Sequence, residues 1–343
     1  MSEQKSFWTG RSVFVTGATG LLGSALVPML VRQGANVVAL VRDSAPRSLL
    51  VSEGWLSRIA SVHGSLTDER LMRRVLAEYE VETVFHLGAQ TLVGVAKVDP
   101  VSTLEANIRG TWLLLEGARL SGVKQVVVAS SDKAYGPSAA LPYHEDYPLQ
   151  GIYPYDVSKS CTDLITTMYH RTYGLPAAIV RCGNLFGGGD LNYSRLVPGV
   201  IAATLRNEPF LIRSDGKFVR DFLYVEDAAE AYMLLAEQMA ANPALLGEAF
   251  NFGLGLKITM IELVESILAM MNRSDLRPIV QNIASAEIRE QYLDAGKAAK
   301  LLNWAPRYGM EGGLRRTIEW YTRAFEQLAR EAAAAASKSV AKS

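Results

Sequence analysis

Short apolar runs alternate with amphipathic segments along the first half of the chain. The apolar runs lie at 13–15, 37–41, 83–87, 125–129 and 177–180, and segments with the helical spacing of apolar residues lie near 67–79, 100–120 and 157–173. The runs are continuously apolar and do not alternate with polar residues, which is typical of strands buried on both faces of a parallel sheet. An antiparallel sandwich would show that alternation. The pattern therefore predicts an α/β chain built on a doubly wound parallel sheet.

A glycine-rich turn joins the first apolar run to the helical pattern that follows. It reads Thr16-Gly17-Ala18-Thr19-Gly20-Leu21-Leu22-Gly23. Gly17 can adopt backbone angles closed to other residues, Gly20 lets the chain approach a pyrophosphate, and Gly23 lets the helix press on the strand. The helix N-terminus would direct free N–H groups and its positive dipole end at the phosphates. The candidate cofactor-binding residues of this turn are Gly17, Thr19, Gly20, Leu21, Leu22 and Gly23.

The alternative for this turn is an ordinary tight connection between a strand and a helix. The strand before it, the helix after it and the second strand up to Val41 favour a dinucleotide site. The second strand ends in Leu40-Val41-Arg42-Asp43. An acidic residue there binds the ribose hydroxyls of NAD, whereas an arginine accepts the 2′-phosphate of NADP. Arg42 mildly favours NADP, Asp43 could still bind the ribose, and the two could also be a solvated turn pair, so both cofactors stay open.

The rhythm of strands and helices breaks after Arg181. Glycine-rich and polar segments follow at 187–190 and 213–217, with helical patterns near 225–239 and 259–271. We expect a dinucleotide-binding Rossmann domain at 1–180, with segments near 222–253 returning to it, and a smaller C-terminal α/β substrate-binding region at 181–330. Residues 331–343 are mostly alanine, serine and lysine, which predicts a flexible tail or a fraying helix.

Two polar clusters are candidates for catalysis. Tyr155 and Lys159 are four residues apart on a helical pattern, so both side chains lie on one face. An ammonium near a phenol lowers the pKa of the phenol, which would let Tyr155 act as a base toward a substrate hydroxyl. Ser131, Asp132 and Lys133 follow the apolar run 125–129, at the carboxyl end of a parallel strand, where ligands bind. The alternative for Asp132 and Lys133 is a surface ion pair.

Composition limits the classes of partner. The 343 residues include 35 Lys and Arg and 35 Asp and Glu, so the formal net charge is zero and nothing attracts nucleic acid or anionic lipid over long range. Two cysteines exclude a disulfide framework, and four scattered histidines give no ligand spacing for a metal. Neither a leader peptide nor an apolar stretch of membrane-spanning length is evident. We expect a cytoplasmic protein that binds neither membranes, nor nucleic acid, nor a metal.

The chain resembles the extended short-chain dehydrogenase/reductase family, and within it the nucleotide-sugar epimerases and dehydratases. Besides the motifs above, the resemblance rests on 85–90 (FHLGAQ), 107–111 (NIRGT), 181–187 (RCGNLFG), 220–227 (RDFLYVED) and 302–306 (LNWAP). Ser131-Asp132-Lys133 is similar to the Ser/Thr-Asp-Lys of the 4,6-dehydratases. The segments 7–10 (FWTG), 89–93 (AQTLV) and 183–190 (GNLFGGGD) look most like the CDP-glucose 4,6-dehydratases.

The resemblance implies a reaction and a role for each catalytic residue. A 4,6-dehydratase converts a nucleotide-diphosphate hexose, such as CDP-glucose, to the 4-keto-6-deoxy sugar by internal hydride transfer through tightly bound, recycled NAD or NADP. Tyr155 would take the proton of the C4 hydroxyl beside Lys159, and Ser131 would hydrogen-bond that oxygen. Lys133 would remove the C5 proton, while Asp132 would protonate the departing C6 hydroxyl.

The resemblance also implies binding residues and an assembly. Cofactor contacts would come from Leu66, Leu87, Ala89, Gln90, Asn107, Tyr155 and Lys159 in addition to the glycine turn, Arg42 and Asp43. Diphosphate contacts would come from Asn184 and Arg220, with Arg195 and Arg289 as weaker candidates. Family membership implies a homodimer or homotetramer through the helices at 100–120 and 157–173.

Two other functions remain open. A nucleotide-sugar 4-epimerase would use the same Ser131, Tyr155 and Lys159 but would leave Asp132 and Lys133 without a chemical task. A binding or regulatory module that lost catalysis is the other alternative. The chain also departs from the CDP-glucose subgroup, because Arg220-Asp221-Phe222 replaces its arginine-proline-tryptophan pattern and the loop 136–151 lacks its tryptophan-rich insertion. The reaction type is therefore better indicated than the nucleotide.

Overall fold

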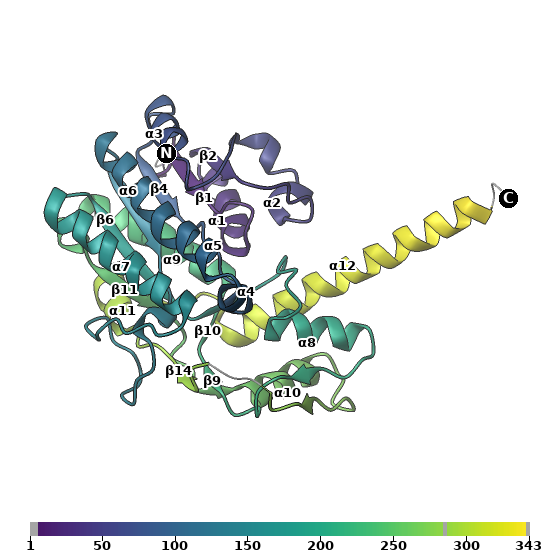
Figure 1. Cartoon of the computed structure of the whole chain (residues 1–343). Coiled ribbons are helices and arrows are strands. Elements are labelled where there is room, and N and C mark those ends of the chain that lie inside the picture. Colours follow the sequence, from purple (N-terminus) through teal and green to yellow (C-terminus); the bar gives the residue numbers. More distant parts are fainter. Residues whose placement is uncertain (1–5, 284–286, 341–343) are drawn as a thin grey trace, which may run out of the picture.

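A seven-stranded parallel sheet lies at the centre of the molecule (Figure 1). In the computed structural model, which describes residues 6–283 and 287–340, the strand order is β3-β2-β1-β4-β5-β6-β11. The strands are β1 (Ser12–Thr16), β2 (Asn36–Val41), β3 (Ala60–His63), β4 (Thr83–His86), β5 (Gln125–Ala129), β6 (Ala177–Cys182) and β11 (Ala249–Phe252). The predicted doubly wound parallel sheet is confirmed.

The direction in which successive strands are added reverses beside β1. Phe14 of β1 lies opposite Val38 of β2 on one side and opposite Val84 of β4 on the other. The connections therefore run away from β1 in opposite directions. In an open parallel sheet, such a switch point leaves a crevice outside the carboxyl ends of the strands, where ligands bind.

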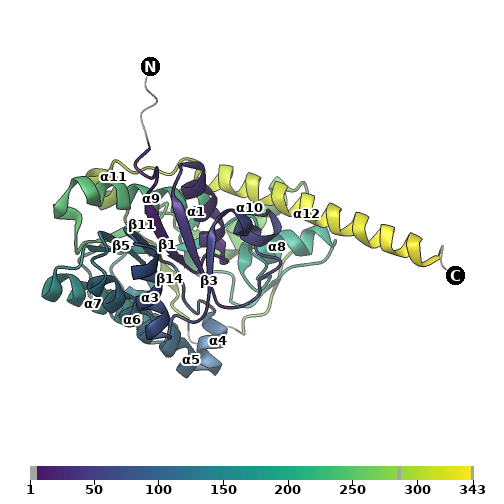
Figure 2. The ribbon, with the colours of Figure 1, turned by 90° about the horizontal axis from the view of Figure 1, so that it is seen from above.

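Helices cover both faces of the sheet, as Figure 2 shows from above. On one side lie α1 (Leu21–Arg32), α9 (Val225–Ala241) and α11 (Gly296–Leu302), and on the other lie α3 (Glu69–Glu78), α6 (Gly110–Leu120) and α7 (Pro154–Tyr173). Successive residues of β1 point to opposite layers: Val13 and Val15 pack with α1 and α9, and Phe14 packs with α3 and α6. Burial on both faces explains why the strand sequences are continuously apolar.

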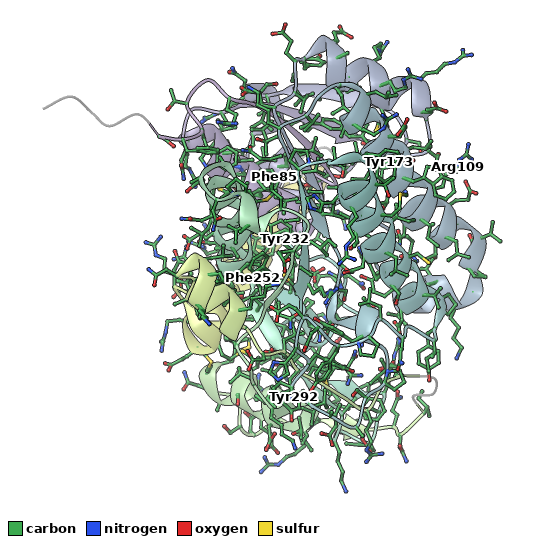
Figure 3. The ribbon with its side chains drawn as sticks, turned by 90° about the vertical axis from the view of Figure 1, so that its left-hand side faces the viewer. Phe85, Arg109, Tyr173, Tyr232, Phe252 and Tyr292 are labelled. Carbon is green, nitrogen blue, oxygen red and sulfur yellow. The ribbon has the colours of Figure 1, made fainter. Side chains whose placement is uncertain are left out.

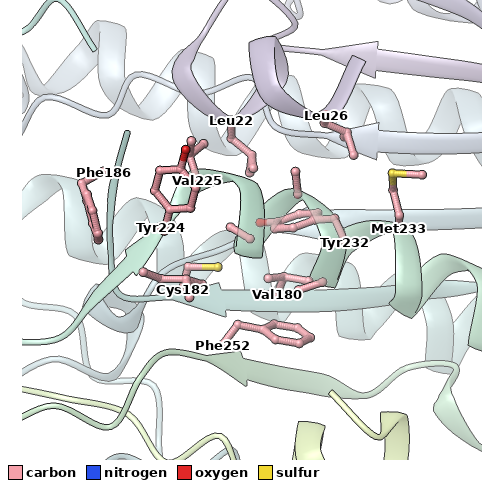
Figure 4. Packing of buried hydrophobic residues seen from close by; sticks show 14 of the residues in the cluster. Leu22, Leu26, Val180, Cys182, Phe186, Tyr224, Val225, Tyr232, Met233 and Phe252 are labelled. Atoms are coloured by element: carbon pink, nitrogen blue, oxygen red, sulfur yellow. The ribbon is translucent and has the colours of Figure 1, made fainter. Parts of the chain in front are cut away.

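The larger of the two cores lies between the sheet and the layer of α1 and α9. It includes Phe85 and Tyr232, which Figure 3 places in the interior of the molecule. Figure 4 shows Leu26 of α1 beside Met233 of α9. This packing fixes α1, and with it the turn that precedes α1, against the sheet.

Short elements form the second region, which lies below the sheet in Figure 1. They are β7 (Asn184–Phe186), α8 (Leu196–Leu205), β8 (Leu211–Ile212), β9 (Val219–Arg220), β10 (Phe222–Tyr224), β12 (Ile258–Thr259), α10 (Met260–Met270), β13 (Ile279–Val280) and β14 (Glu290–Gln291). β7 pairs with β10, β9 with β12 and β14, and β8 with β13. Between these elements the chain returns to the first region, where α9 packs on α1 and β11 becomes the edge strand beside β6.

The remaining elements are short connections and one long helix. The connections are α2 (Leu49–Ser52), η1 (Leu56–Arg58), α4 (Val93–Val98), α5 (Pro100–Leu104), the π-helical turn η2 (Glu105–Arg109), η3 (Asp132–Tyr135) and η4 (Pro243–Leu245). Helix α12 (Gly309–Val340) starts against β10 and α8 and then projects away from the body (Figure 1). The expected tail at 331–343 therefore begins inside α12, and 341–343 lie outside the described residues. Among the described helices, none combines the length and the apolar character that crossing a bilayer requires.

Candidate active site

A cleft of about 1690 Å³ lies at the carboxyl ends of the strands. One wall consists of the turn after β1 and the ends of β4 and β5, and the other comes from α8, β9 and the residues around them. Pockets for a single drug-sized ligand enclose about 300 to 1,000 Å³. This cleft therefore has room for more than one such ligand.

The glycine turn forms a cradle at one end of the cleft. Gly17 has a φ of +70°, and a Cβ on it would lie 2.7 Å from the backbone N of Gly88. A Cβ on Gly23 would lie 2.3 Å from the carbonyl oxygen of Gly17, so helix α1 presses on the turn itself. A Cβ on Gly20 would approach only the Gly17 oxygen, at 3.2 Å. Gly20 caps α1 without a side-chain hydrogen bond, so the first N–H groups of α1 are available to an anion.

The other predicted cofactor residues divide into two groups. Thr19, Leu21, Leu22, Leu66, Leu87 and Ala89 line the cleft together with Arg42 and Asp43. Arg42 donates from Nε to Asp43 Oδ2 at 2.6 Å, and both side chains are 68% exposed. The cleft therefore presents both the acid that suits a ribose and the arginine that suits a 2′-phosphate.

Gln90 and Asn107 do not line the cleft. Asn107 is buried, accepts a hydrogen bond from the backbone N of Gln90 at 2.7 Å, and donates to the Gln90 carbonyl oxygen and to Ser158 Oγ, both at 2.9 Å. Its amide thereby ties the segment after β4 to helix α7. These two residues therefore help to position the cleft wall but do not line the cleft themselves.

Tyr155 and Lys159 lie buried on one face of α7, as their spacing predicts. Lys159 Nζ donates to the carbonyl oxygen of Ala129 at 2.7 Å, which anchors α7 to the end of β5. Burial lowers the pKa of Lys159 to about 8, and the Asp163 carboxylate opposes this shift. Burial raises the pKa of Tyr155 above its usual range; the Asp132 carboxylate adds to the rise and a hydrogen bond with Ser131 opposes it.

The expected lowering of the Tyr155 pKa by Lys159 is therefore wrong for this structure. Burial raises the pKa of the phenol by more than the neighbouring positive charge lowers it. Lys159 directs its ammonium at a backbone carbonyl of β5 and does not rank among the groups that set the Tyr155 pKa.

Ser131, Asp132 and Lys133 lie where β5 meets η3, and all three line the cleft. Ser131 Oγ donates to Asp132 Oδ1 at 2.9 Å, and Lys133 Nζ donates to Gln291 Oε1. Burial lowers the pKa of Lys133, and the Arg220 guanidinium lowers it further, while the carboxylates of Asp132, Asp156 and Glu287 oppose. The lysine thus has the lowered pKa that a base requires. Asp132 is buried, and within the described part of the chain its Oδ2 has no hydrogen-bond partner.

A buried ion pair supports the two clusters, and the sequence analysis missed it. Arg181, at the end of β6, donates to Asp163 Oδ1 from Nε at 2.8 Å and from Nη2 at 2.6 Å. Ser130 donates to the other oxygen of Asp163, and Arg181 Nη1 donates to Tyr135 Oη at 2.8 Å. The available signals were the four-residue spacing from Lys159 to Asp163 and an arginine ending an apolar strand.

The four predicted substrate residues do not all reach the cleft. Asn184, Arg195 and Arg220 line it; Asn184 Nδ2 donates to the Asp221 carbonyl oxygen at 3.3 Å, and Arg195 Nη1 donates to Asp190 at 2.9 Å. Arg289 is not among the lining residues; its side chain is 64% exposed and pairs with Asp215 at 3.0 Å.

Arg220 is buried at the cleft and already has protein partners. It donates to the carbonyl oxygens of Val219 and Arg289 and to Glu287 Oε2 at 3.4 Å. Across residues 6–283 and 287–340, no group of three or more His, Cys, Asp or Glu side chains is arranged to hold a metal ion.

Comparison with known proteins gives both dehydratases and epimerases. Residues 13–253 match the NAD dependent epimerase/dehydratase family. The CDP-glucose 4,6-dehydratase of Salmonella typhimurium is 31% identical over 331 residues, which cover 92% of each chain. The UDP-glucose 4-epimerase of Mycolicibacterium smegmatis is 32% identical over 313 residues, which cover 90% of this chain and 97% of the epimerase.

Solved structures agree with this result. The crystal structure of a dTDP-glucose 4,6-dehydratase from Streptomyces venezuelae with NAD bound superposes with a TM-score of 0.82 and 29% identity, covering 91% of this chain and 97% of that one. Since dehydratases and epimerases are similar to this chain to nearly the same degree, the choice between their reactions depends on the site.

Proposed function

The chain belongs to the NAD-dependent epimerase/dehydratase family, and from that premise we propose that it is a nucleotide-hexose 4,6-dehydratase acting on CDP-glucose or a similar nucleotide sugar. The observation that carries the proposal is the pair Asp132 and Lys133, the first buried and the second half-buried, which lines the cleft together with Tyr155. A buried acid and a lysine of lowered pKa have a task in eliminating water. A 4-epimerase has no step that needs them.

The glycine cradle suits a dinucleotide, because Gly20 leaves the approach to the N-terminus of α1 open. We propose NAD or NADP as a tightly held, recycled cofactor; when bound, it supplies a hydride acceptor for C4 and a hydride donor for C6. Arg42 and Asp43 would face its adenosine ribose. Tyr155 and Lys159 would lie beside its reactive end, since they line the same cleft further along the sheet edge.

Tyr155 acts first, as the base that takes the proton of the sugar C4 hydroxyl. Burial opposes ionisation of the phenol, and the hydrogen bond with Ser131 opposes the effect of burial. With a pKa of about 8, Lys159 is mainly an ammonium at neutral pH. Removing the C4 hydrogens gives a ketone, which makes the neighbouring C5 hydrogen acidic.

Lys133 and Asp132 then eliminate water across C5 and C6. Lys133, as the free amine, takes the C5 proton, while the protonated carboxyl of Asp132 gives its proton to the C6 hydroxyl, which leaves as water. Lys133 later returns its proton to C5. The cycle leaves Tyr155 with one extra proton and Asp132 with one too few. Ser131 donates to Asp132 and is hydrogen-bonded to Tyr155, so it offers the path for that proton.

The substrate's diphosphate needs local positive charge, since the net charge of the chain is zero. We assign this role to Arg220 and Arg195 with Asn184, which line the cleft from the second region. Arg289 is left out because it pairs with Asp215 outside the cleft lining.

We further propose that the enzyme is a cytoplasmic homodimer or homotetramer. Both cysteines are free, which suits a reducing compartment. Helices α5, α6 and α7 pack together and expose Val101, Trp112, Leu164 and Met168, which are 40% to 69% exposed. The outward position of Tyr173 on the same layer is visible in Figure 3. A Trp112→Glu variant should shift light scattering after gel filtration toward the monomer; an unchanged mass would argue against this surface.

Mass spectrometry tests the reaction. The protein is incubated with CDP-, dTDP-, GDP- and UDP-hexoses and NAD or NADP, and we expect one of these sugars to lose one water. A Lys133→Met variant should still oxidise C4, seen as reduced-cofactor fluorescence, but release no dehydrated product. No change of mass, with a new sugar isomer in the NMR spectrum, would contradict the dehydratase and indicate the epimerase.

A further inference from the structure

Gln291 is the hydrogen-bond partner of Lys133, and the reaction above gives it no role. Lys133 Nζ donates to Gln291 Oε1, although the two residues lie 158 positions apart in the sequence. Gln291 is buried, with 0% exposure, and within residues 6–283 and 287–340 its Nε2 has no hydrogen-bond partner. A buried amide nitrogen without a partner is unfavourable, so such a group calls for an explanation.

The backbone on both sides of β14 fixes the position of Gln291. In β14 it lies opposite Arg220 of the parallel strand β9. The loop after η3 holds the following residues, because Tyr143 N donates to the Tyr292 carbonyl oxygen and Asp294 N donates to the Tyr143 carbonyl oxygen, both at 2.9 Å. The Gln291 amide is therefore presented to Lys133 from a strand that is paired on both sides.

Gln291 contacts Lys133 from the side away from the cleft. Lys133 lines the cleft at η3, whereas Gln291 is not among the lining residues. The hydrogen bond also joins the two regions of the molecule, because η3 follows the central sheet and β14 belongs to the second region. Gln291 thus acts on Lys133 without reaching the space in which the sugar would lie.

An uncharged acceptor suits a lysine that must react as a free amine. Both an ammonium and an amine can donate an N–H to an amide oxygen, so this contact holds the nitrogen in either form. A carboxylate in the same place would favour the ammonium. In the described part of the chain Lys133 forms no ion pair, and the Glu287 carboxylate pairs instead with Arg220 at 3.4 Å.

Charged groups from several elements act on Lys133, and Gln291 adds no charge to them. The groups that face Lys133 or Gln291 are Arg220 of β9, Asp132 of η3, Asp156 of α7, Glu287 before β14 and Tyr143 of the loop after η3. Burial lowers the pKa of Lys133, Arg220 adds to that effect, and the three carboxylates oppose it. A neutral partner leaves this balance unchanged.

We propose that Gln291 is a positioning residue that holds the Lys133 nitrogen through one N–H and leaves its lone pair for the C5 proton. This inference rests on the proposed dehydratase function. It accounts for the unpartnered Nε2, because the role requires only the amide oxygen. It also accounts for an amide at this position, since a carboxylate would favour the ammonium and an apolar group would not hold the nitrogen.

Two substitutions of similar size separate the two properties of the amide. Gln291→Glu keeps an acceptor and adds a negative charge that favours the ammonium, so the acid limb of the dehydration rate should move about 1 to 3 pH units upward. Gln291→Met keeps the volume and removes the acceptor, so the dehydration rate should fall about 10- to 100-fold with no upward move of that limb. C4 oxidation, followed by reduced-cofactor fluorescence, should keep its wild-type rate in both variants.

Gln33→Glu is the matched control. Gln33 is an exposed glutamine at the end of α1 that accepts a hydrogen bond from Ser6 Oγ at 2.8 Å, and it does not line the cleft. The control should keep the wild-type rates and the wild-type pH profile.

Two results would overturn the proposal. One is an acid limb that does not move in Gln291→Glu; the other is a loss in either variant that affects C4 oxidation and dehydration equally, which would show a structural role. If wild type dehydrates none of the nucleotide sugars, the proposed function fails, and a ¹⁵N NMR titration of the Lys133 amine still tests the contact. Its midpoint should lie at higher pH in Gln291→Glu than in wild type, and an equal midpoint would contradict the inference.

Discussion

The ion pair between Asp163 and Arg181 lies beneath both catalytic clusters, and its removal gives a sharp prediction. Both residues are buried, and the guanidinium makes hydrogen bonds of 2.8 and 2.6 Å to one carboxylate oxygen. Asp163→Asn preserves the shape but leaves Arg181 charged and without its counter-ion. Breaking a buried pair from one side costs about 3 to 5 kcal/mol. We expect the free energy of unfolding to fall by that amount.

The same substitution should change the pH dependence of catalysis. The Asp163 carboxylate raises the pKa of Lys159, against the larger effect of burial, which brings it down to about 8. Without that charge the pKa of Lys159 drops further, and less ammonium is present at neutral pH. Any limb of the rate profile that reports the Lys159 ammonium should therefore move to lower pH in Asp163→Asn.

Urea unfolding, followed by tryptophan fluorescence, measures the change in the free energy of unfolding. Arg181→Met and the double variant complete a cycle, in which the double variant should lose less than the sum of the single variants because neither partner is left charged alone. Glu311→Gln is the control: its pair with Arg315, at 2.9 Å, is exposed on α12 and should contribute about 0 to 1 kcal/mol. A cost below about 1 kcal/mol for Asp163→Asn, or strict additivity in the cycle, would refute this reasoning.

Three further predictions concern the cleft and the chain segments around it. Gly17→Ala should lower both the free energy of unfolding and the affinity for the cofactor, since the φ of Gly17 is +70° and the new Cβ would meet the backbone after β4. Gly20→Ala, at an ordinary φ of −78°, should lower the cofactor affinity and keep nearly native stability. Urea unfolding and cofactor titration separate the two effects. Arg42→Ala should weaken NADP more than NAD in competition titrations, and equal weakening would assign Arg42 no phosphate contact. Asp221→Asn should lower stability by about 1 to 3 kcal/mol, because the carboxylate accepts from four backbone N–H groups, and a change within error would contradict that.

Local patterns were enough to predict the sheet and the cradle. Continuous apolar runs identified strands that are buried on both faces. The runs are continuous because successive residues, such as Val13, Phe14 and Val15, are buried in two different layers. The glycine spacing was informative because two constraints act within the turn, namely the positive φ of Gly17 and the approach of a Gly23 Cβ to the Gly17 carbonyl oxygen. Such features depend on residues close together in the sequence.

Features that depend on distant residues were missed or mistaken. Arg181 meets Asp163 across two elements, and no local pattern specifies that pair. Arg289 was a weaker candidate for a diphosphate contact, with a solvated surface role as the alternative, and it pairs with Asp215 outside the cleft lining. The pKa of Tyr155 was predicted from its spacing to Lys159, but burial by the whole fold decides its direction. Burial and long-range pairing are properties of the folded chain, which spacing alone does not contain.

The most direct test of the central claim follows the C4 hydrogen. The protein is given the nucleotide hexose that it converts, carrying deuterium at C4, and the product is analysed by NMR and mass spectrometry. A 4,6-dehydratase that uses Tyr155, Asp132 and Lys133 as proposed moves that deuterium to C6 within the same molecule, with loss of one water. Deuterium that returns to C4, in a sugar of unchanged composition and inverted C4 configuration, would contradict the account and identify an epimerase.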